Sequence, residues 1–117
     1  MTEVIEPAIE TVTIDVVLSA LADPVRLTLV RALDAAGDWT CGSDILKNTG
    51  VTIGKSTLSH HMKVLRDAGL IRTRVDGIRR LVTLRYDDVE RRFPGLLTML
   101  REHGPTRAAV AAPASTA

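Results

Sequence analysis

A stripe of short polar and basic side chains runs along residues 55–66. Ser56, Ser59, His60 and Lys63 follow one another at i, i+3, i+4 and i+7, the spacing of residues on one face of an α-helix. Hydroxyl, imidazole and ammonium groups can form hydrogen bonds with the edges of bases and with phosphates. The stripe therefore indicates binding chemistry, directed at duplex nucleic acid.

A plain solvated face is the alternative interpretation of this stripe. Solvated helix faces usually carry long Glu, Lys and Gln side chains, which favour helix and cover apolar neighbours. Here the first turns carry small or cationic side chains, and the helix has no acid before Asp67. Small residues allow DNA to approach closely, and an acid would repel phosphate. The residues of this helix predicted to contact DNA are Lys55, Ser56, Thr57, Ser59, His60, Lys63 and Arg66.

The opposite face of the same helix is apolar and leads into a β-hairpin. Leu58, Met62, Leu65 and Gly69 share that face, and Ala68-Gly69 ends the helix. Two alternating segments follow, about 70–75 and 79–85, joined at Asp76-Gly77, a dipeptide typical of hairpin turns. A helix followed by a basic hairpin is the recognition unit of a winged helix. The hairpin residues predicted to contact DNA, at least two of them through phosphate, are Arg72, Arg74, Arg79 and Arg80.

Charge is strongly polarised along the chain, although the net charge is only +1. Residues 1–46 hold two basic residues against eight acids, whereas residues 47–92 hold eleven against five. The basic half coincides with the helix and hairpin, as expected of a surface that attracts phosphate.

The rest of the chain predicts a mainly α-helical domain with one small hairpin, in the order α-α-α-α-β-β-α. Thr13 is expected to cap a first helix, Asp23-Pro24 to begin a second that ends before Gly37, and residues 43–48 to form a third that Gly50 stops. Asp87 should cap a last helix that is interrupted at Phe93-Pro94-Gly95. Residues 1–10 are predicted to be a flexible arm, 11–104 a dimeric winged helix-turn-helix domain for DNA binding and dimerisation, and 105–117 a disordered tail.

Composition excludes several classes of protein. The 117 residues are enough for one domain, no apolar run approaches a membrane span, and the acidic start does not resemble a signal peptide. A single cysteine fits a reducing cytoplasm, and 3% aromatic residues disfavour single-stranded nucleic acid as the ligand. The chain has no catalytic triad motif, phosphate-binding glycine loop or cluster of metal ligands. We therefore expect a cytoplasmic protein that is not an enzyme.

Two blocks of sequence resemble the ArsR/SmtB-type winged-helix regulators of bacteria. One is the helix start Asp23-Pro24-x-Arg26, and the other runs from Ser59-His60-His61-Met62 through Leu65 to Ala68-Gly69-Leu70-Ile71. The resemblance covers residues 12–100 and implies a homodimeric repressor that binds a pseudo-palindromic operator and is released by an effector. It also implies that the first and last helices form the dimer interface, here Ile14, Val17, Leu18, Leu21, Leu96, Leu97 and Leu100.

Many members of that family sense metal ions, but neither of their common ligand patterns is intact here. Where thiolate-type members have Cys-x-Cys-Asp, this chain reads Cys41-Gly42-Ser43-Asp44, and the Asp-x-His pair of the other group is missing from 87–90. We expect no cofactor, no standard metal site, an inert, half-buried thiol at Cys41 and a partly buried His61 that is not a metal ligand. A non-standard Ni or Zn site that uses His103 or the acids Glu3, Glu6 and Glu10 remains an alternative. So does an activator or an assembly module that acts with a protein co-regulator.

Overall fold

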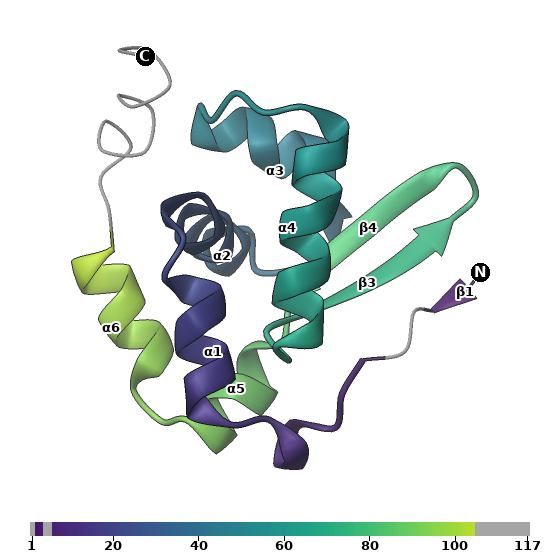
Figure 1. Ribbon diagram of the computed structural model, residues 1–117. Coiled ribbons are helices and arrows are strands. Elements are labelled where there is room, and N and C mark those ends of the chain that lie inside the picture. The colour runs from purple at the N-terminus through teal and green to yellow at the C-terminus, as the bar shows by residue number, and fades with distance from the viewer. Residues whose placement is uncertain (1, 4–5, 105–117) are drawn as a thin grey trace.

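The computed structural model describes residues 2–3 and 6–104. Six α-helices pack together, and the central hairpin of a small sheet projects from one side of the helical body (Figure 1). In chain order the elements are β1 (Thr2–Glu3), a 3-10 helix (Ile9–Thr11), α1 (Ile14–Leu21), α2 (Pro24–Ala36), β2 (Thr40–Cys41), α3 (Gly42–Thr49), α4 (Lys55–Asp67), β3 (Ile71–Asp76), β4 (Arg79–Leu84), α5 (Tyr86–Arg92) and α6 (Leu96–His103). This arrangement confirms the predicted winged helix-turn-helix, in which α3 and α4 form the helix-turn-helix and β3–β4 the wing.

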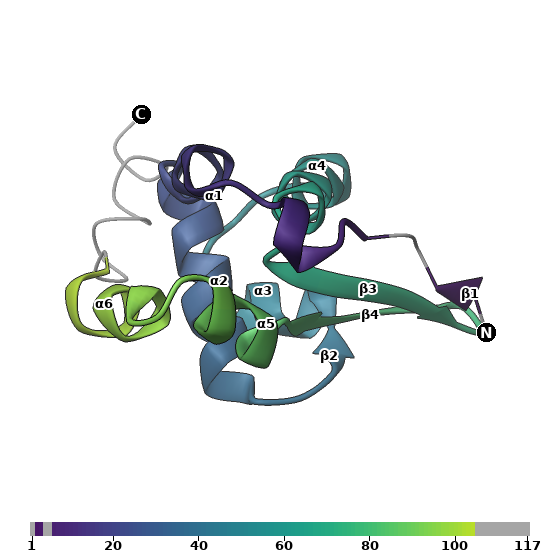
Figure 2. The same ribbon diagram turned by 90° about the horizontal axis from the view of Figure 1, so that it is seen from below.

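The sheet is antiparallel, with strand order β1-β3-β4-β2. The register of the wing pairs Ile71 with Leu84 at its base and Asp76 with Arg79 beside the turn. Seen from below, the wing extends to one side of the molecule, while α6 lies at the opposite side (Figure 2). The two-residue strands β1 and β2, which the sequence does not predict, lie along the outer edges of the hairpin.

One hydrophobic core holds the helices against the base of the wing. Leu65 of α4, Leu29 of α2 and Ile71 of β3 are all completely buried within it. The chain turns between α4 and β3 at Gly69, whose φ of +80° favours glycine, and a Cβ there would lie 2.6 Å from Cγ2 of Val12. The Ala68-Gly69 pair therefore ends the recognition helix and also lets the N-terminal segment pack closely against it.

Most of the predicted helix ends are confirmed, the predicted cap at Thr13 is right in position only, and the predicted cap at Asp87 is wrong. Oδ1 of Asp23 accepts hydrogen bonds from the first turn of α2, as expected. Thr13 does occupy the N-cap position of α1, but its side chain makes no capping hydrogen bond. Asp87 lies inside the first turn of α5, whose N-cap is Arg85. The sequence prediction placed the helix start too late, because Arg85 follows the last residue of β4 directly and is already the N-cap of α5.

The N-terminal segment makes more contacts than the prediction of a flexible arm anticipates. Ile9 is buried in the core, and a carboxylate oxygen of Glu6 accepts a hydrogen bond from the backbone N–H of Thr73. The buried guanidinium of Arg85 donates to the carbonyl of Pro7 and also to Asp88. Glu6 and Thr73, and likewise Pro7 and Arg85, are more than sixty residues apart in the chain, so no local pattern reveals these contacts. The predicted tail, 105–117, lies outside the described residues.

Arg26 connects the recognition helix to the two helices before it. Its Nε donates to the carbonyl of Ala20 at the end of α1 (2.7 Å), and its Nη1 lies 3.1 Å from Nδ1 of His61 on α4. A guanidinium can only donate, so Nδ1 of His61 accepts and the neutral ring carries its proton on Nε2. His61 is buried, somewhat more than the partly buried histidine that the sequence predicts, and it is a structural partner of Arg26.

The pKa of His61 lies below its ordinary value of 6.5. Burial is the largest cause; the Asp23 carboxylate opposes the shift and the Arg26 cation reinforces it. The folded protein therefore favours the neutral imidazole. In the unfolded chain the imidazole takes up a proton near its ordinary pKa of 6.5. The contribution of neutral His61 to the free energy of unfolding is therefore fully present above about pH 6.5 and declines as the pH falls below that value.

The free energy of unfolding should therefore fall as the pH is lowered from 7.5 to 5, with His61 contributing at most about 1.4 kcal/mol per pH unit. Urea titrations across this range measure the slope. His61→Gln keeps a hydrogen-bond acceptor but cannot titrate, so its slope should be flatter. His103→Gln, a change on the exposed end of α6, is the matched control and should keep the wild-type slope. Equal slopes for all three proteins would contradict the assigned role of His61.

Candidate nucleic-acid interface

The predicted reading face of α4 is exposed on the folded chain. Seven residues are predicted to contact DNA from this helix, and only Arg66 among them is partly buried; Lys55, Ser56, Thr57, Ser59, His60 and Lys63 are exposed. On the other side, Leu65 is buried, while Leu58 and Met62 are half-buried against the core. The structure therefore brings the small and basic residues together on one solvent-facing surface, because the apolar stripe holds α4 in a single rotational setting.

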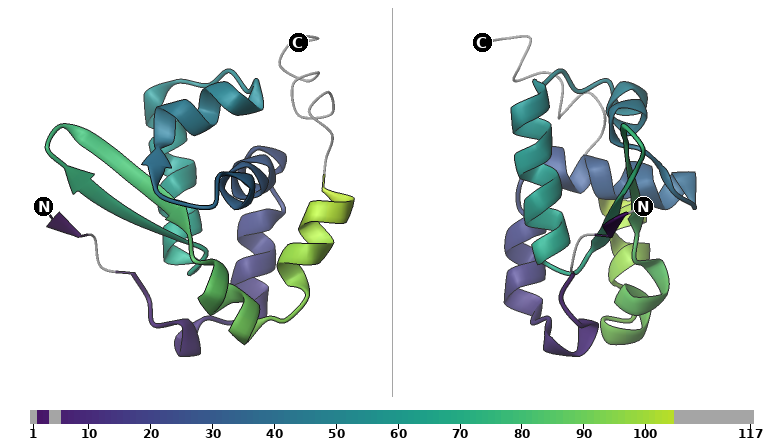
Figure 3. Two further views of the ribbon diagram at one scale, coloured as in Figure 1. Left: turned by 180° about the vertical axis from the view of Figure 1, so that it is seen from behind. Right: turned by 90° about the vertical axis from the view of Figure 1, so that its right-hand side faces the viewer.

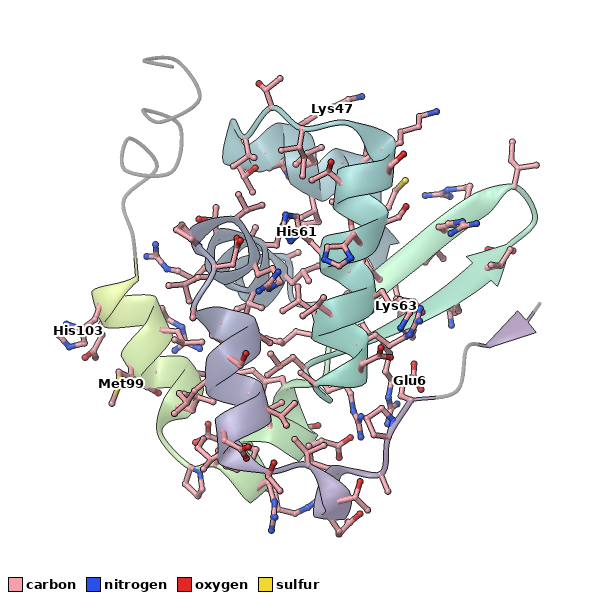
Figure 4. All side chains as sticks on the ribbon, viewed as in Figure 1. Glu6, Lys47, His61, Lys63, Met99 and His103 are labelled. Atoms are coloured by element: carbon pink, nitrogen blue, oxygen red, sulfur yellow. The ribbon has the colours of Figure 1, made fainter. Side chains whose placement is uncertain are left out.

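Lys63 and Arg66 both form an ion pair with Asp67 on the helix itself, and that of Lys63 is the shorter. Nζ of Lys63 lies 2.6 Å from Oδ2 of Asp67, one turn later, and both side chains are more than half exposed. Exposed pairs at i, i+4 are weak, so a phosphate can compete with Asp67 for the ammonium. In Figure 4, Lys63 lies on the side of α4 next to the wing.

The four predicted arginines of the wing occupy three different environments. Arg79 and Arg80 begin β4 beside the turn and are exposed. Arg72 lies near the base of the wing, with Nη2 3.4 Å from Oδ2 of Asp88, and Arg74 lays its guanidinium 4.2 Å from the ring centre of Trp39. Arg72 and Arg74 therefore have partners within the protein, and only Arg79 and Arg80 lie at the tip.

The tip of the wing also carries a large apolar residue that sequence reasoning missed. Ile78 follows Gly77 in the turn and is completely exposed. An isoleucine is unusual in a turn that otherwise consists of Asp and Gly, and this unusual composition could have identified Ile78 from the sequence alone. The wing lies beside α4 and projects away from the helical body in views from the front and from behind (Figures 1 and 3).

The residues weighed as metal ligands mostly have protein partners. Cys41 is the N-cap residue of α3, and its Sγ lies 3.2 Å from Oγ of Ser43; this hydrogen bond is the main reason that the pKa of the thiol is lowered. Burial raises the pKa of Asp88, but the hydrogen bond and charge of Arg85, with Arg72 and Arg91, outweigh burial and hold it below its ordinary value. Within residues 2–3 and 6–104, no three His, Cys, Asp or Glu side chains come together in a way that could hold a metal ion.

The predicted dimer residues divide into a core set and a surface set. Val17, Leu21 and Leu97 are buried inside the protomer, which corrects their assignment to an interface. Leu96 and Leu100 are half-buried against the same core, and Ile14 and Leu18 are about half exposed. Val16 and Met99, which sequence reasoning missed, are also exposed. Met99 lies on the outer side of α6, at the end of the molecule away from α4 and the wing (Figure 4).

Known proteins with similar sequences are also helix-turn-helix regulators. The family model described as a helix-turn-helix domain matches residues 21–74, from the end of α1 into β3. The HTH-type transcriptional regulator YceK of Bacillus subtilis (strain 168) is 39% identical over 85 residues, which are 72% of this chain and 82% of that protein. The arsenical resistance operon repressor of Staphylococcus xylosus is 35% identical over 71 residues, 61% of this chain and 64% of that protein. None of the described helices has the length and apolar character needed to cross a membrane.

Proposed function

Because the chain belongs to the ArsR-type helix-turn-helix transcriptional regulators, we propose that it binds duplex DNA as a homodimer and represses transcription until an effector releases it. The observation that carries the proposal is the exposed small and basic face of α4 beside the two arginines at the wing tip. In a symmetric dimer two such faces would enter successive major grooves of a pseudo-palindromic operator. Ser59 and His60 would read base edges, and Lys63, Arg79 and Arg80 would contact phosphates.

Fluorescence anisotropy with a labelled duplex from the protein's own promoter tests this proposal. Binding to that duplex should be tighter than to a scrambled duplex and should weaken steeply with salt. Flat, non-selective binding would contradict it and would favour a regulator that depends on a protein partner. Repeating the titration with Zn²⁺ or Ni²⁺ tests whether either ion is the effector.

Ser59→Glu and Lys63→Glu should each weaken operator binding by at least about tenfold, since a carboxylate on the reading face repels phosphate and removes a hydrogen bond. Both positions are exposed, so thermal unfolding should stay close to that of the wild type. Ala35→Glu adds a carboxylate to an exposed position of α2 and should leave binding unchanged. Wild-type affinity in a folded Ser59→Glu variant would show that the reading face is misplaced.

Replacing both tip arginines, Arg79→Ala with Arg80→Ala, should weaken binding to the operator and to the scrambled duplex by a similar factor. The slope of log affinity against log salt should become shallower by about 2, because each lost phosphate contact removes about 0.9. Arg91→Ala, an exposed position on α5, serves as the control and should keep the wild-type slope. An unchanged slope in the double variant would mean that the wing does not touch phosphate.

Leu18→Glu should convert the proposed dimer into a folded monomer, because it places a charge on the exposed apolar part of α1. Sedimentation measures the mass and circular dichroism the fold. Ile78→Glu makes the same change at the wing tip, outside the proposed interface, and should leave the mass unchanged. A Leu18→Glu protein with the mass of the wild type would exclude this part of α1 from the interface.

A further inference from the structure

A cavity of about 620 Å³ lies between the recognition helix, the start of α3 and the wing. Small organic ligands usually occupy sites of about 300–1,000 Å³. We call it the wing cavity; its lining residues are Cys41, Gly42, Ser43, Lys55, Leu58, Ser59, Met62, Lys63, Arg66, Thr73, Arg74, Val75, Ile78, Arg79, Arg80, Leu81 and Val82.

The lining of the wing cavity combines positive charge with an apolar surface. Two lysines and four arginines contribute to it, and none of the lining residues is an acid. Six further residues are apolar, of which Leu81 and Val82 are buried in the sheet, and Leu58 and Met62 are half-buried on the inward side of α4. Such a lining is complementary to a molecule that carries a negative charge on an apolar body.

Polar atoms without partners are concentrated in the same place. Among the described residues, five buried side-chain nitrogen or oxygen atoms lack a hydrogen-bond partner. Three of them belong to residues that line the wing cavity: Oγ1 of Thr73, Nε of Arg74 and Nε of Arg66, which has only an ion pair at 3.8 Å with Oδ1 of Asp67. Buried polar groups in folded proteins nearly always have partners, so these groups can donate hydrogen bonds to an acceptor that occupies the cavity.

We propose that the wing cavity binds a small amphipathic organic anion, a carboxylate on an aliphatic chain. The carboxylate lies among the basic side chains, including Lys63 and Arg66, and the chain lies over Leu58, Met62 and Val82. A free inorganic anion would leave the apolar surface unused. A neutral apolar molecule would bury the cations without a counter-charge, which is costly.

Occupation of the wing cavity would interfere with DNA. Lys55, Lys63, Arg79 and Arg80 line the cavity and also belong to the proposed DNA surface. A bound carboxylate neutralises part of that surface, and its aliphatic chain fills the space between α4 and the wing. This regulatory step rests on the proposed function, whereas binding of the anion does not.

Calorimetric titration of the full chain with decanoate tests the binding step, with acetate, inorganic phosphate and decan-1-ol as comparison ligands. Decanoate should bind saturably, one molecule per chain, and at least ten times more tightly than any of the other three. Equal affinity for phosphate or acetate would overturn the need for an apolar body. Equal affinity for decan-1-ol would overturn the need for charge, and no decanoate binding would overturn the assignment.

Val75→Asp locates the bound anion. Val75 is a half-buried lining residue of β3, and a carboxylate there should weaken decanoate binding at least tenfold. Thr83→Asp makes a comparable change on β4 outside the cavity lining and should keep wild-type affinity, with circular dichroism as a check of folding in both variants. Wild-type decanoate affinity in a folded Val75→Asp variant would overturn the location.

The anisotropy assay separates this inference from the proposed function. Decanoate should release the operator over the concentration range in which it binds the protein. Decanoate binding without release would overturn the regulatory step. Operator binding by a protein that does not bind decanoate would overturn the inference and leave the proposed function intact. Decanoate binding by a protein that does not bind the operator would overturn the proposed function and leave the assignment of the anion site intact.

Discussion

The guanidinium of Arg26 donates to the carbonyl of Ala20 in the last turn of α1 and to the imidazole of His61 on α4, while the backbone N–H of Arg26 donates to the capping carboxylate of Asp23. These hydrogen bonds join the recognition helix to the first two helices. Buried Leu65 then fixes the rotation of α4 about its own axis. Everything that the exposed face of α4 can do depends on these two restraints, one polar and one apolar. The Asp23-Pro24-x-Arg26 sequence thus both starts a helix and positions another.

A second consequence of the packing is that some arginines are bound to groups of the protein itself, while others are exposed to solvent. Arg85 is buried and binds Asp88 together with the carbonyl of Pro7, and Arg72 shares that carboxylate. Both arginines hold the base of the wing against α5 and the N-terminal segment. The arginines near the turn are left to solvent. The positive charge available to a ligand is therefore smaller than the count of basic residues suggests, and it is concentrated between α4 and the tip of the wing.

The same side chains serve the proposed DNA surface and the wing cavity, which gives a simple physical basis for regulation. Phosphate and carboxylate are both oxyanions, so they compete for the same cations. The apolar lining distinguishes the two ligands, because only an amphipathic anion can use it. A regulator built in this way needs no large conformational change to respond, since the ligand occupies part of the surface that the operator requires.

The sequence by itself determined the element types, the order of the helices and the wing, the cap at Asp23, the break at 93–95 and the polarity of charge. These features follow from interactions between residues a few positions apart, which leave periodic or capping patterns. Only the tertiary structure decided that Val17, Leu21 and Leu97 belong to the core, that Arg72 and Arg74 have internal partners, and that the N-terminal segment pairs with the wing. A helical stripe is equally apolar whether it faces the protomer's own core or a second subunit. Contacts between distant segments and the cavity that they enclose depend on three-dimensional distance, which no local pattern encodes.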